Sequence, residues 1–135
     1  MQFELLTPEE PIFEGEIEMI SGKSTSEGSF GMLPRHLPSV MKLETAPLKI
    51  KTGAEERLFS VNGGFLIKDE EELVRVLTYS ADTAEELEEG EVRKKIEQIE
   101  EKISELTEEE KEEKKELEKK LRKARVDLKV IEGEK

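Results

Sequence analysis

The spacing of apolar residues changes once along the chain, near residue 80, and this change limits the folds open to it. Before it, apolar and polar residues alternate, as from Phe13 to Met19, where Gly15 and Ile17 stand between glutamates. Alternation places one set of side chains on one face of a β-strand. After it, apolar residues recur every three or four positions, the spacing of one helix face. We therefore predict strands first and helices second.

Several more short apolar runs precede residue 80, and turn-forming residues separate them. The runs cover 48–51, 57–61, 65–67 and 73–77, and the turns include Asn62-Gly63-Gly64. Many short strands at this spacing are typical of a β-sandwich or barrel. We predict an α+β fold, with an antiparallel β-sandwich over residues 1–82.

The second half carries two apolar seams of similar length. One consists of Val92, Ile96, Ile99, Ile103 and Leu106, and the other of Leu117, Leu121, Ala124, Leu128 and Ile131. Between them, Thr107-Glu108-Glu109-Glu110 has the form of a capping box, which predicts the start of a second helix. We expect an antiparallel two-helix hairpin over residues 83–135. Two interpretations stay equally favoured: a hairpin that detaches easily, and a helical cap that stays docked.

Composition excludes several classes of function. The formal net charge is −12, which repels nucleic-acid phosphates and anionic lipid. No cysteine is present, and no run of eighteen apolar residues occurs, so we expect neither disulfides nor insertion into a membrane. The abundance of Glu and Lys is typical of heat-adapted proteins, although long solvated helices produce the same bias. We expect no catalytic residues and no metal site, because His36 is the only histidine.

The segment Gly22-Lys23-Ser24-Thr25 resembles the end of a phosphate-binding loop. That loop requires a glycine five positions before the second one and a helix after it. Ile17 stands at the glycine position, and Gly28, Gly31 and Pro34 follow where the helix would begin. We therefore interpret the segment as a flexible turn and not as a nucleotide site.

Four motifs together resemble the epsilon subunit of F-type ATP synthases. They are Thr7-Pro8-Glu9 with Ile12-Phe13-Glu14-Gly15-Glu16, the stretch from Glu27 to Pro38, Phe59-Ser60-Val61-Asn62-Gly63-Gly64-Phe65, and Val74 to Ala81. The resemblance implies a non-catalytic rotor subunit of the central stalk. Its sandwich would bind the gamma subunit and the c-subunit ring, for proton- or sodium-driven ATP synthesis. Its hairpin would restrain ATP hydrolysis by the alpha and beta subunits.

The resemblance also implies a location and a set of contact residues. The protein would lie at the cytoplasmic face of the cell membrane, peripherally, as part of the synthase. The loop that touches the c ring would include Ser29, Phe30, Met32, Arg35 and His36. The possible inhibitory cations are Lys119, Lys120, Arg122, Lys123 and Arg125. For this basic segment, balancing the acidic first helix is an equally favoured role.

Many members of that family bind ATP at the start of the first helix through an aspartate, an arginine and an alanine. Glu88, Glu91 and Val92 stand at the matching positions, and Arg93 follows. Because Glu91 would repel phosphate, we expect no cofactor and make no claim of an ATP site. The alternative to a rotor subunit is a free-standing β-sandwich module with a coiled-coil arm that docks a helical partner.

Overall fold

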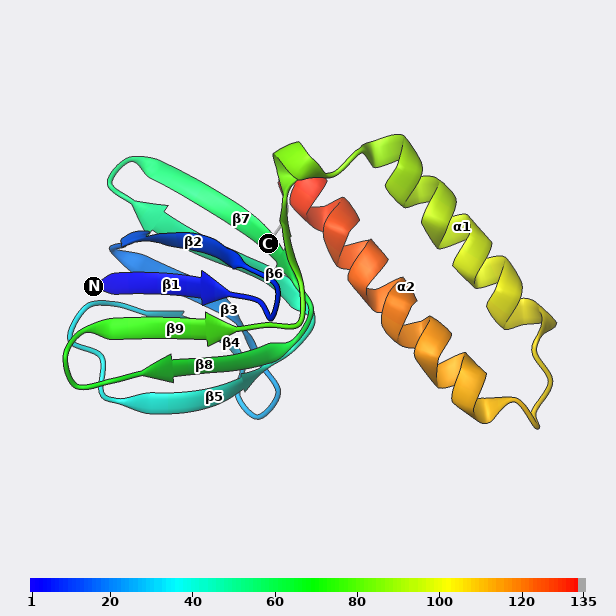
Figure 1. Cartoon of the computed structure of the whole chain (residues 1–135), viewed down its shortest axis with the longest axis horizontal. Helices are drawn as coiled ribbons and strands as arrows, with labels where there is room; N and C mark the ends of the chain where they lie inside the picture. Colours follow the sequence, from blue (N-terminus) through cyan, green and yellow to red (C-terminus); the bar gives the residue numbers. More distant parts are fainter. Residues whose placement is uncertain (134–135) are drawn as a thin grey trace.

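The alternating half of the chain forms ten strands and the helical half forms two helices, as the computed structural model shows for residues 1–133 (Figure 1). The strands are β1 (Gln2–Leu6), β2 (Pro11–Glu16), β3 (Met19–Ser24), β4 (Gly28–Met32), β5 (Ser39–Leu43), β6 (Ala46–Thr52), β7 (Glu55–Val61), β8 (Gly64–Lys68), β9 (Leu73–Leu77) and β10 (Ala81–Thr83). A short 3-10 helix, η1 (Ala84–Glu86), leads to α1 (Glu89–Glu105) and α2 (Lys111–Ile131).

The strands form one hydrogen-bonded sheet in the order β10-β7-β6-β3-β5-β8-β9-β1-β2, with β4 attached to β3. β3 and β5 share a single pairing, between Ser24 and Leu43, so the sheet divides there into two halves. Core residues of both halves pack together, among them Phe3, Leu66, Leu48 and Phe59. The predicted sandwich is confirmed, and all its strand pairs are antiparallel except β1 with β9, which is parallel.

The alternating run from Phe13 to Met19 is not one strand. β2 ends at Glu16 and β3 begins at Met19, because the chain crosses here from one half of the sheet to the other. Ile17 is buried at the crossing, and its N–H donates to the carbonyl of Met1 at 2.9 Å. The alternation continues through the crossing, so the pattern alone could not reveal it.

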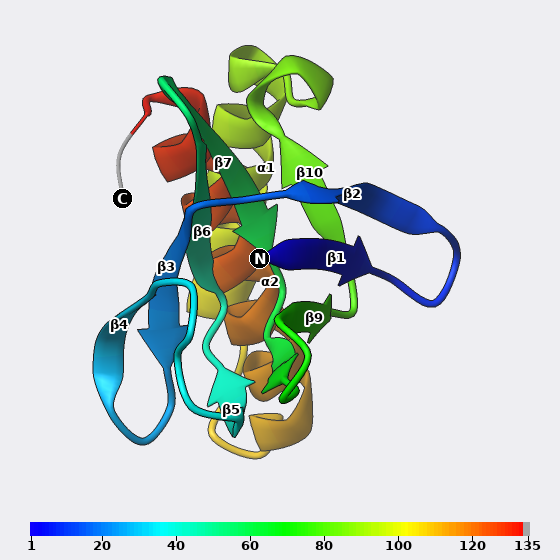
Figure 2. The same ribbon diagram turned by 90° about the vertical axis from the view of Figure 1, so that its left-hand side faces the viewer.

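The helical hairpin lies against one half of the sandwich. α2 contacts β6, β7 and β10 and also packs along α1, so it lies between the strands and α1 (Figure 1), and it appears behind β6 and β7 in Figure 2. The predicted seams are confirmed where the helices meet: Val92 and Ile99 are the buried seam residues of α1, and Leu121 and Ala124 are those of α2. α2 has further buried residues beyond its seam, which are Val126, Asp127 and Val130.

The connection between the helices differs from the predicted capping box. The carboxylate of Glu110 accepts from the N–H and the hydroxyl of Thr107, at 3.3 and 3.0 Å, but α2 begins only at Lys111. The hydroxyl of Thr107 is engaged as a donor to Glu110, so the two residues close a turn before the helix. The division between residues 82 and 83 remains a prediction, and β10 runs across it.

Candidate functional site

One half of the sandwich exposes large apolar side chains on its outer surface. Val40 of β5 lies opposite Ile67 of β8, and Phe65 of β8 lies opposite Leu77 of β9. Their exposed fractions are 72%, 37%, 48% and 42%, and we call these four residues the apolar face. The half that carries α2 is the other one. Lys42 and Arg75, which pair with Phe65 and Ile67, are exposed on the same face. Exposed apolar side chains on adjacent strands, bordered by charged ones, are typical of a protein-binding surface.

The backbone holds β8 and β9 close together beside the apolar face. Gly64 has a φ of +116°, and a Cβ at this position would lie 2.0 Å from the carbonyl oxygen of Leu77. Only glycine fits such an approach. The Asn62-Gly63-Gly64 turn therefore brings Phe65 and Leu77 next to each other.

The predicted ring-contact residues divide into exposed and buried ones. Ser29, Arg35 and His36 are exposed, and Phe30 is partly buried against the core. Met32 is fully buried in the sandwich core, so its side chain is not on the surface and the structure removes it from the set. Gly28–Met32 is strand β4, and the loop is only residues 33–38. Leu33 and Leu37 are its exposed apolar residues, at 60% and 78%.

The loop of residues 33–38 is attached to the β8–β9 turn, and both lie at the end of the sandwich away from the helices (Figure 1). The backbone N–H of Arg35 donates to Oε1 of Glu72 at 2.8 Å. The same oxygen accepts from Nζ of Lys68 at 3.2 Å, although Lys68 is only 3% exposed. We call Arg35, Lys68 and Glu72 the loop clamp.

The loop clamp predicts a local pH dependence. The N–H of Arg35 lowers the pKa of Glu72 below its ordinary 4.5. Burial opposes this effect in part, and the hydrogen bond and the charge of Lys68 each make a smaller contribution that lowers the pKa further. Because this pKa is lower in the folded state, the stabilisation is present above the ordinary value and is lost as the pH falls through the lowered one. In NMR spectra, we expect the chemical shift of the Arg35 amide to follow the titration of the Glu72 carboxyl, with a midpoint below pH 4.5. Glu72→Gln should remove this transition. A midpoint above that value would contradict the clamp geometry.

The segment that resembles a phosphate-binding loop is mainly a strand. Gly22, Lys23 and Ser24 belong to β3, and only Thr25 lies in the following turn. The buried hydroxyl of Ser24 accepts from the N–H of Glu27 at 2.9 Å, and β4 follows instead of a helix. The exclusion of a nucleotide loop is confirmed, whereas the interpretation as a flexible turn is wrong for all but Thr25.

A polar network lies where α2 meets the sandwich. Asp127 accepts from the hydroxyl of Ser60 and from Nζ of Lys123, and Lys123 also donates to Oδ2 of Asp82 at 2.9 Å. Ser60 and Asp82 are paired across β7 and β10. The side chains of Lys123 and Asp127 are only 13% and 10% exposed. We call these four residues the docking network, since they join the hairpin to the sandwich.

The basic segment of α2 therefore does not act as one surface. Lys123 belongs to the docking network. Lys119 is paired with Glu116 on its own helix at 3.6 Å, and Arg125 with Glu100 of α1 at 3.5 Å. Lys120 and Arg122 are exposed. Lys123 therefore does not lie on a free face of the helix, because the side of α2 that carries it is covered by the sandwich.

The residues at the degenerate nucleotide motif have structural partners. The carboxylate of Glu88 caps α1 by accepting from the N–H groups of Gly90 and Glu91, at 3.2 and 2.9 Å. Arg93 forms ion pairs with Glu89 at 3.1 Å and Glu132 at 3.2 Å, so it ties the start of α1 to the end of α2. Glu91 is exposed. This arrangement presents carboxylates where a phosphate would need cations.

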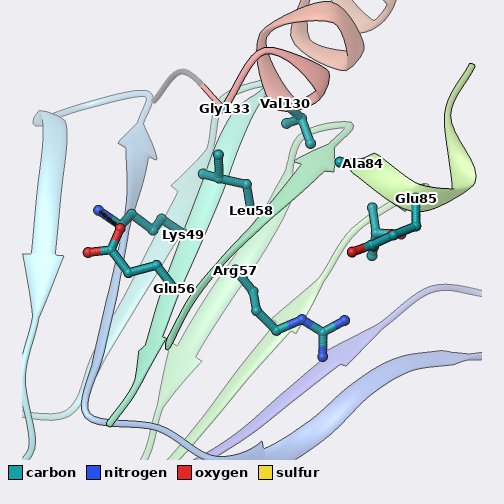
Figure 3. Close-up of a pocket in the computed structure, with 9 residues that line it drawn as sticks. Lys49, Glu56, Arg57, Leu58, Ala84, Glu85, Val130 and Gly133 are labelled. Atoms are coloured by element: carbon teal, nitrogen blue, oxygen red, sulfur yellow. Dashed lines mark ion pairs between the residues drawn. The ribbon is translucent and has the colours of Figure 1, made fainter. Parts of the chain in front are cut away.

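Two pockets lie beside α2. The first, of ≈ 280 Å³, is drawn in Figure 3, where Arg57 extends away from the ion pair of Lys49 and Glu56. The guanidinium of Arg57 lies over the rings of Phe13 and Phe59, at 5.1 and 5.5 Å from their centroids. Both cations that line the first pocket, Lys49 and Arg57, therefore already have partners. The second pocket, of ≈ 470 Å³, lies between the hairpin and Thr45 and includes Arg122, Arg125 and Lys129.

Within residues 1–133, no cluster of three or more His, Asp or Glu side chains has the arrangement of a metal site. No helix of this part of the chain is long and apolar enough to cross a membrane. Sequence reasoning missed the apolar face, the loop clamp and the docking network. The sequence did contain a signal for the apolar face. Consecutive apolar residues place apolar side chains on both faces of a strand, and they occur in Val40-Met41 and Phe65-Leu66-Ile67.

Comparison with known proteins gives consistent matches. A family model described as the ATP synthase delta/epsilon chain beta-sandwich domain matches residues 1–87. The ATP synthase epsilon chain of Anoxybacillus flavithermus is 34% identical over 96 residues, which cover 71% of this chain and 70% of that protein. The ATP synthase epsilon chain of Bacillus thuringiensis is 35% identical over 97 residues, covering 70% and 71%.

Two solved structures have a similar fold. A chain of the Euglena gracilis mitochondrial ATP synthase, in a structure of OSCP/F1/c-ring, superposes with a TM-score of 0.68 at 22% identity, covering 96% of this chain and 76% of that one. A chain of the Tetrahymena thermophila mitochondrial ATP synthase central stalk and c ring gives 0.53 at 22% identity, covering 63% and 67%. The similarity to the first extends over the hairpin as well as the sandwich.

Proposed function

The chain belongs to the ATP synthase delta/epsilon chain family, and on this premise we propose that it is a rotor subunit that couples the gamma subunit to the c ring. It is a non-catalytic subunit of the rotary complex, like the epsilon chains to which it is similar. The resemblance seen in the sequence is confirmed by this family membership.

The observation that carries the proposal is that the two halves of the sandwich have different surfaces. One half is covered by α2, and the other carries the apolar face. A rotor subunit needs a permanent attachment that leaves its regulatory arm free to move. We assign the apolar face to gamma, because four exposed apolar side chains on adjacent strands favour a stable protein contact.

We assign the end of the sandwich away from the hairpin to the c ring. The exposed loop 33–38 lies there, with Arg35 and His36 at its tip and Ser29 on the preceding strand. An exposed loop on a rigid scaffold is a common recognition element.

The hairpin, residues 83–135, is the regulatory part in this proposal. In the structure its helix α2 is docked on the sandwich, and release of the hairpin would carry α2 toward the alpha and beta subunits. The exposed Lys120 and Arg122 would then be joined by Lys123. As part of an ATP synthase the protein is peripheral to the membrane, and we place it at the cytoplasmic face of the cell membrane.

Reconstitution of the soluble complex tests the proposal. Gamma should co-purify with the full chain, which a free-standing binding module would not achieve. The ATPase rate should be lower with the full chain than with a chain that ends at Thr83, because the shortened chain keeps β10 and loses the hairpin. Equal rates in two fully assembled complexes would remove the regulatory role, and absence of gamma from both would remove the rotor assignment.

A further inference from the structure

The loop clamp joins two segments that are far apart in the sequence. Arg35 follows β4, and Glu72 ends the turn before β9, 37 positions later. Inside the loop, the N–H of His36 donates to the carbonyl of Leu33 at 3.2 Å. The hydrogen bond from Arg35 to Glu72 connects this loop to the turn between β8 and β9. The orientation of the loop therefore depends on Glu72.

Both ends of this hydrogen bond have an uncommon backbone conformation. Arg35 has a φ of 70° and Glu72 a φ of 65°, and these two are the non-glycine residues with positive φ among residues 1–133. A side chain disfavours the left-handed region, so contacts must hold such residues there. The backbone of Glu72 is also fixed, since its carbonyl accepts from the N–H of Gln2 at 2.9 Å.

The carboxylate of Glu72 is held in place from behind by a buried cation. Nζ of Lys68 donates to Glu72 and to the carbonyl of Asp69, at 3.2 and 3.0 Å. The carboxylate of Asp69 accepts from the N–H groups of Glu71 and Leu73, which fixes the turn. A buried ammonium needs an anionic partner, so Glu72 stays ionised and strengthens its hydrogen bond to Arg35.

We propose that Glu72 is a positioning residue for the c-ring contact: its carboxylate holds Arg35 in the left-handed conformation and so directs the loop 33–38 toward its partner. This inference rests on the proposed function, because the partner is the polar loop surface of the c ring. Leu33 and Leu37 are exposed on either side of Arg35. Their direction changes if the backbone at Arg35 relaxes.

Lys68 provides a way to separate positioning from stability. Glu72→Ala alone would leave the ammonium of Lys68 buried without its carboxylate and would lower the melting temperature for that reason. The informative variant is therefore Lys68→Met with Glu72→Ala, which removes both charges. The matched control is Lys68→Met alone, which keeps the bond from Glu72 to Arg35. Lys68→Met with Glu72→Gln is the conservative variant, since the amide oxygen of glutamine can still accept from Arg35 and no ammonium is left buried.

The test uses the full chain with gamma and the purified c ring of the same organism in detergent. We expect Lys68→Met to keep the protection of the Arg35 amide against hydrogen exchange and the affinity for the ring. In the double variant, the protection factor of the Arg35 amide and the affinity for the ring should each fall about tenfold, the size expected for one charge-assisted hydrogen bond. Lys68→Met with Glu72→Gln should recover part of the loss.

Three results would overturn the inference. If the double variant keeps the Arg35 amide protected, or binds the ring as Lys68→Met does, Glu72 does not position the loop. Leu37→Asp tests the ring contact itself, because it places a charge on an exposed apolar residue of the loop. If it weakens ring binding while the double variant does not, the proposed function stands and the positioning role fails. If Leu37→Asp has no effect, the ring contact is misassigned and the inference falls with it.

Discussion

Lys123→Met is expected to release the hairpin from the sandwich. The substitution leaves Asp127 buried beside Asp82 without the cation that lies between them. Removal of one partner from a buried ion pair costs about 3–5 kcal/mol. Since about 1.4 kcal/mol changes an equilibrium tenfold, the docked population should fall by at least about a hundredfold relative to the undocked one. Fluorescence energy transfer between labels on β7 and α2 measures this change.

The matched control is Lys119→Met, which removes the same charge from the same helix. Lys119 is 72% exposed and paired with Glu116, so its loss should leave docking unchanged. The double variant Lys123→Met with Asp127→Leu should restore docking in large part, because an apolar pair can replace a buried ion pair. If Lys123→Met docks as well as Lys119→Met, the docking network does not hold the hairpin.

The same variant separates two explanations of regulation. If Lys123 acts as an inhibitory cation, its removal should raise the ATPase rate of the soluble complex. If it acts in the docking network, its removal releases the inhibitory hairpin, and the rate should fall. The two explanations thus predict opposite signs for one substitution, and Lys120→Met gives the reference for loss of an exposed cation.

Phe65→Asp together with Leu77→Lys is expected to abolish stable binding of gamma. The two residues are opposite each other on β8 and β9 and form one of the two cross-strand pairs of the apolar face. Buried interface residues of this size contribute about 2 kcal/mol or more each, and charges placed there would also be desolvated. The affinity should therefore fall by about three orders of magnitude. Titration of labelled gamma with the purified chain measures it.

The isolated chain should tolerate this double substitution, because both side chains point outward and the opposite charges can pair across the strands. Its melting temperature should stay within a few degrees of the original. Glu55→Lys, in an exposed position of the other half of the sandwich, is the control for a change of surface charge. Unchanged affinity for gamma in the double variant would show that the apolar face serves another purpose.

The sequence by itself determined the elements and their broad order. Alternation up to residue 80 identified strands, and the steps of three and four identified the helices and the seam between them, including Val92, Ile99 and Leu121. These are local properties, since the backbone geometry of a strand or helix alone decides which side chains share a face. The absence of a phosphate-binding loop at Gly22 was equally readable, because the required glycine and helix are local features.

Only the tertiary structure decided which faces meet. Lys123 and Asp127 look like solvated helix residues in the sequence, and they are buried because β7 and β10 bring Ser60 and Asp82 against them. Val130 became a core residue of the docked hairpin for the same reason. The crossing at Ile17, the clamp between Arg35 and Glu72 and the apolar face all depend on strand order and register. Such pairings join residues tens of positions apart, and no local periodicity encodes them.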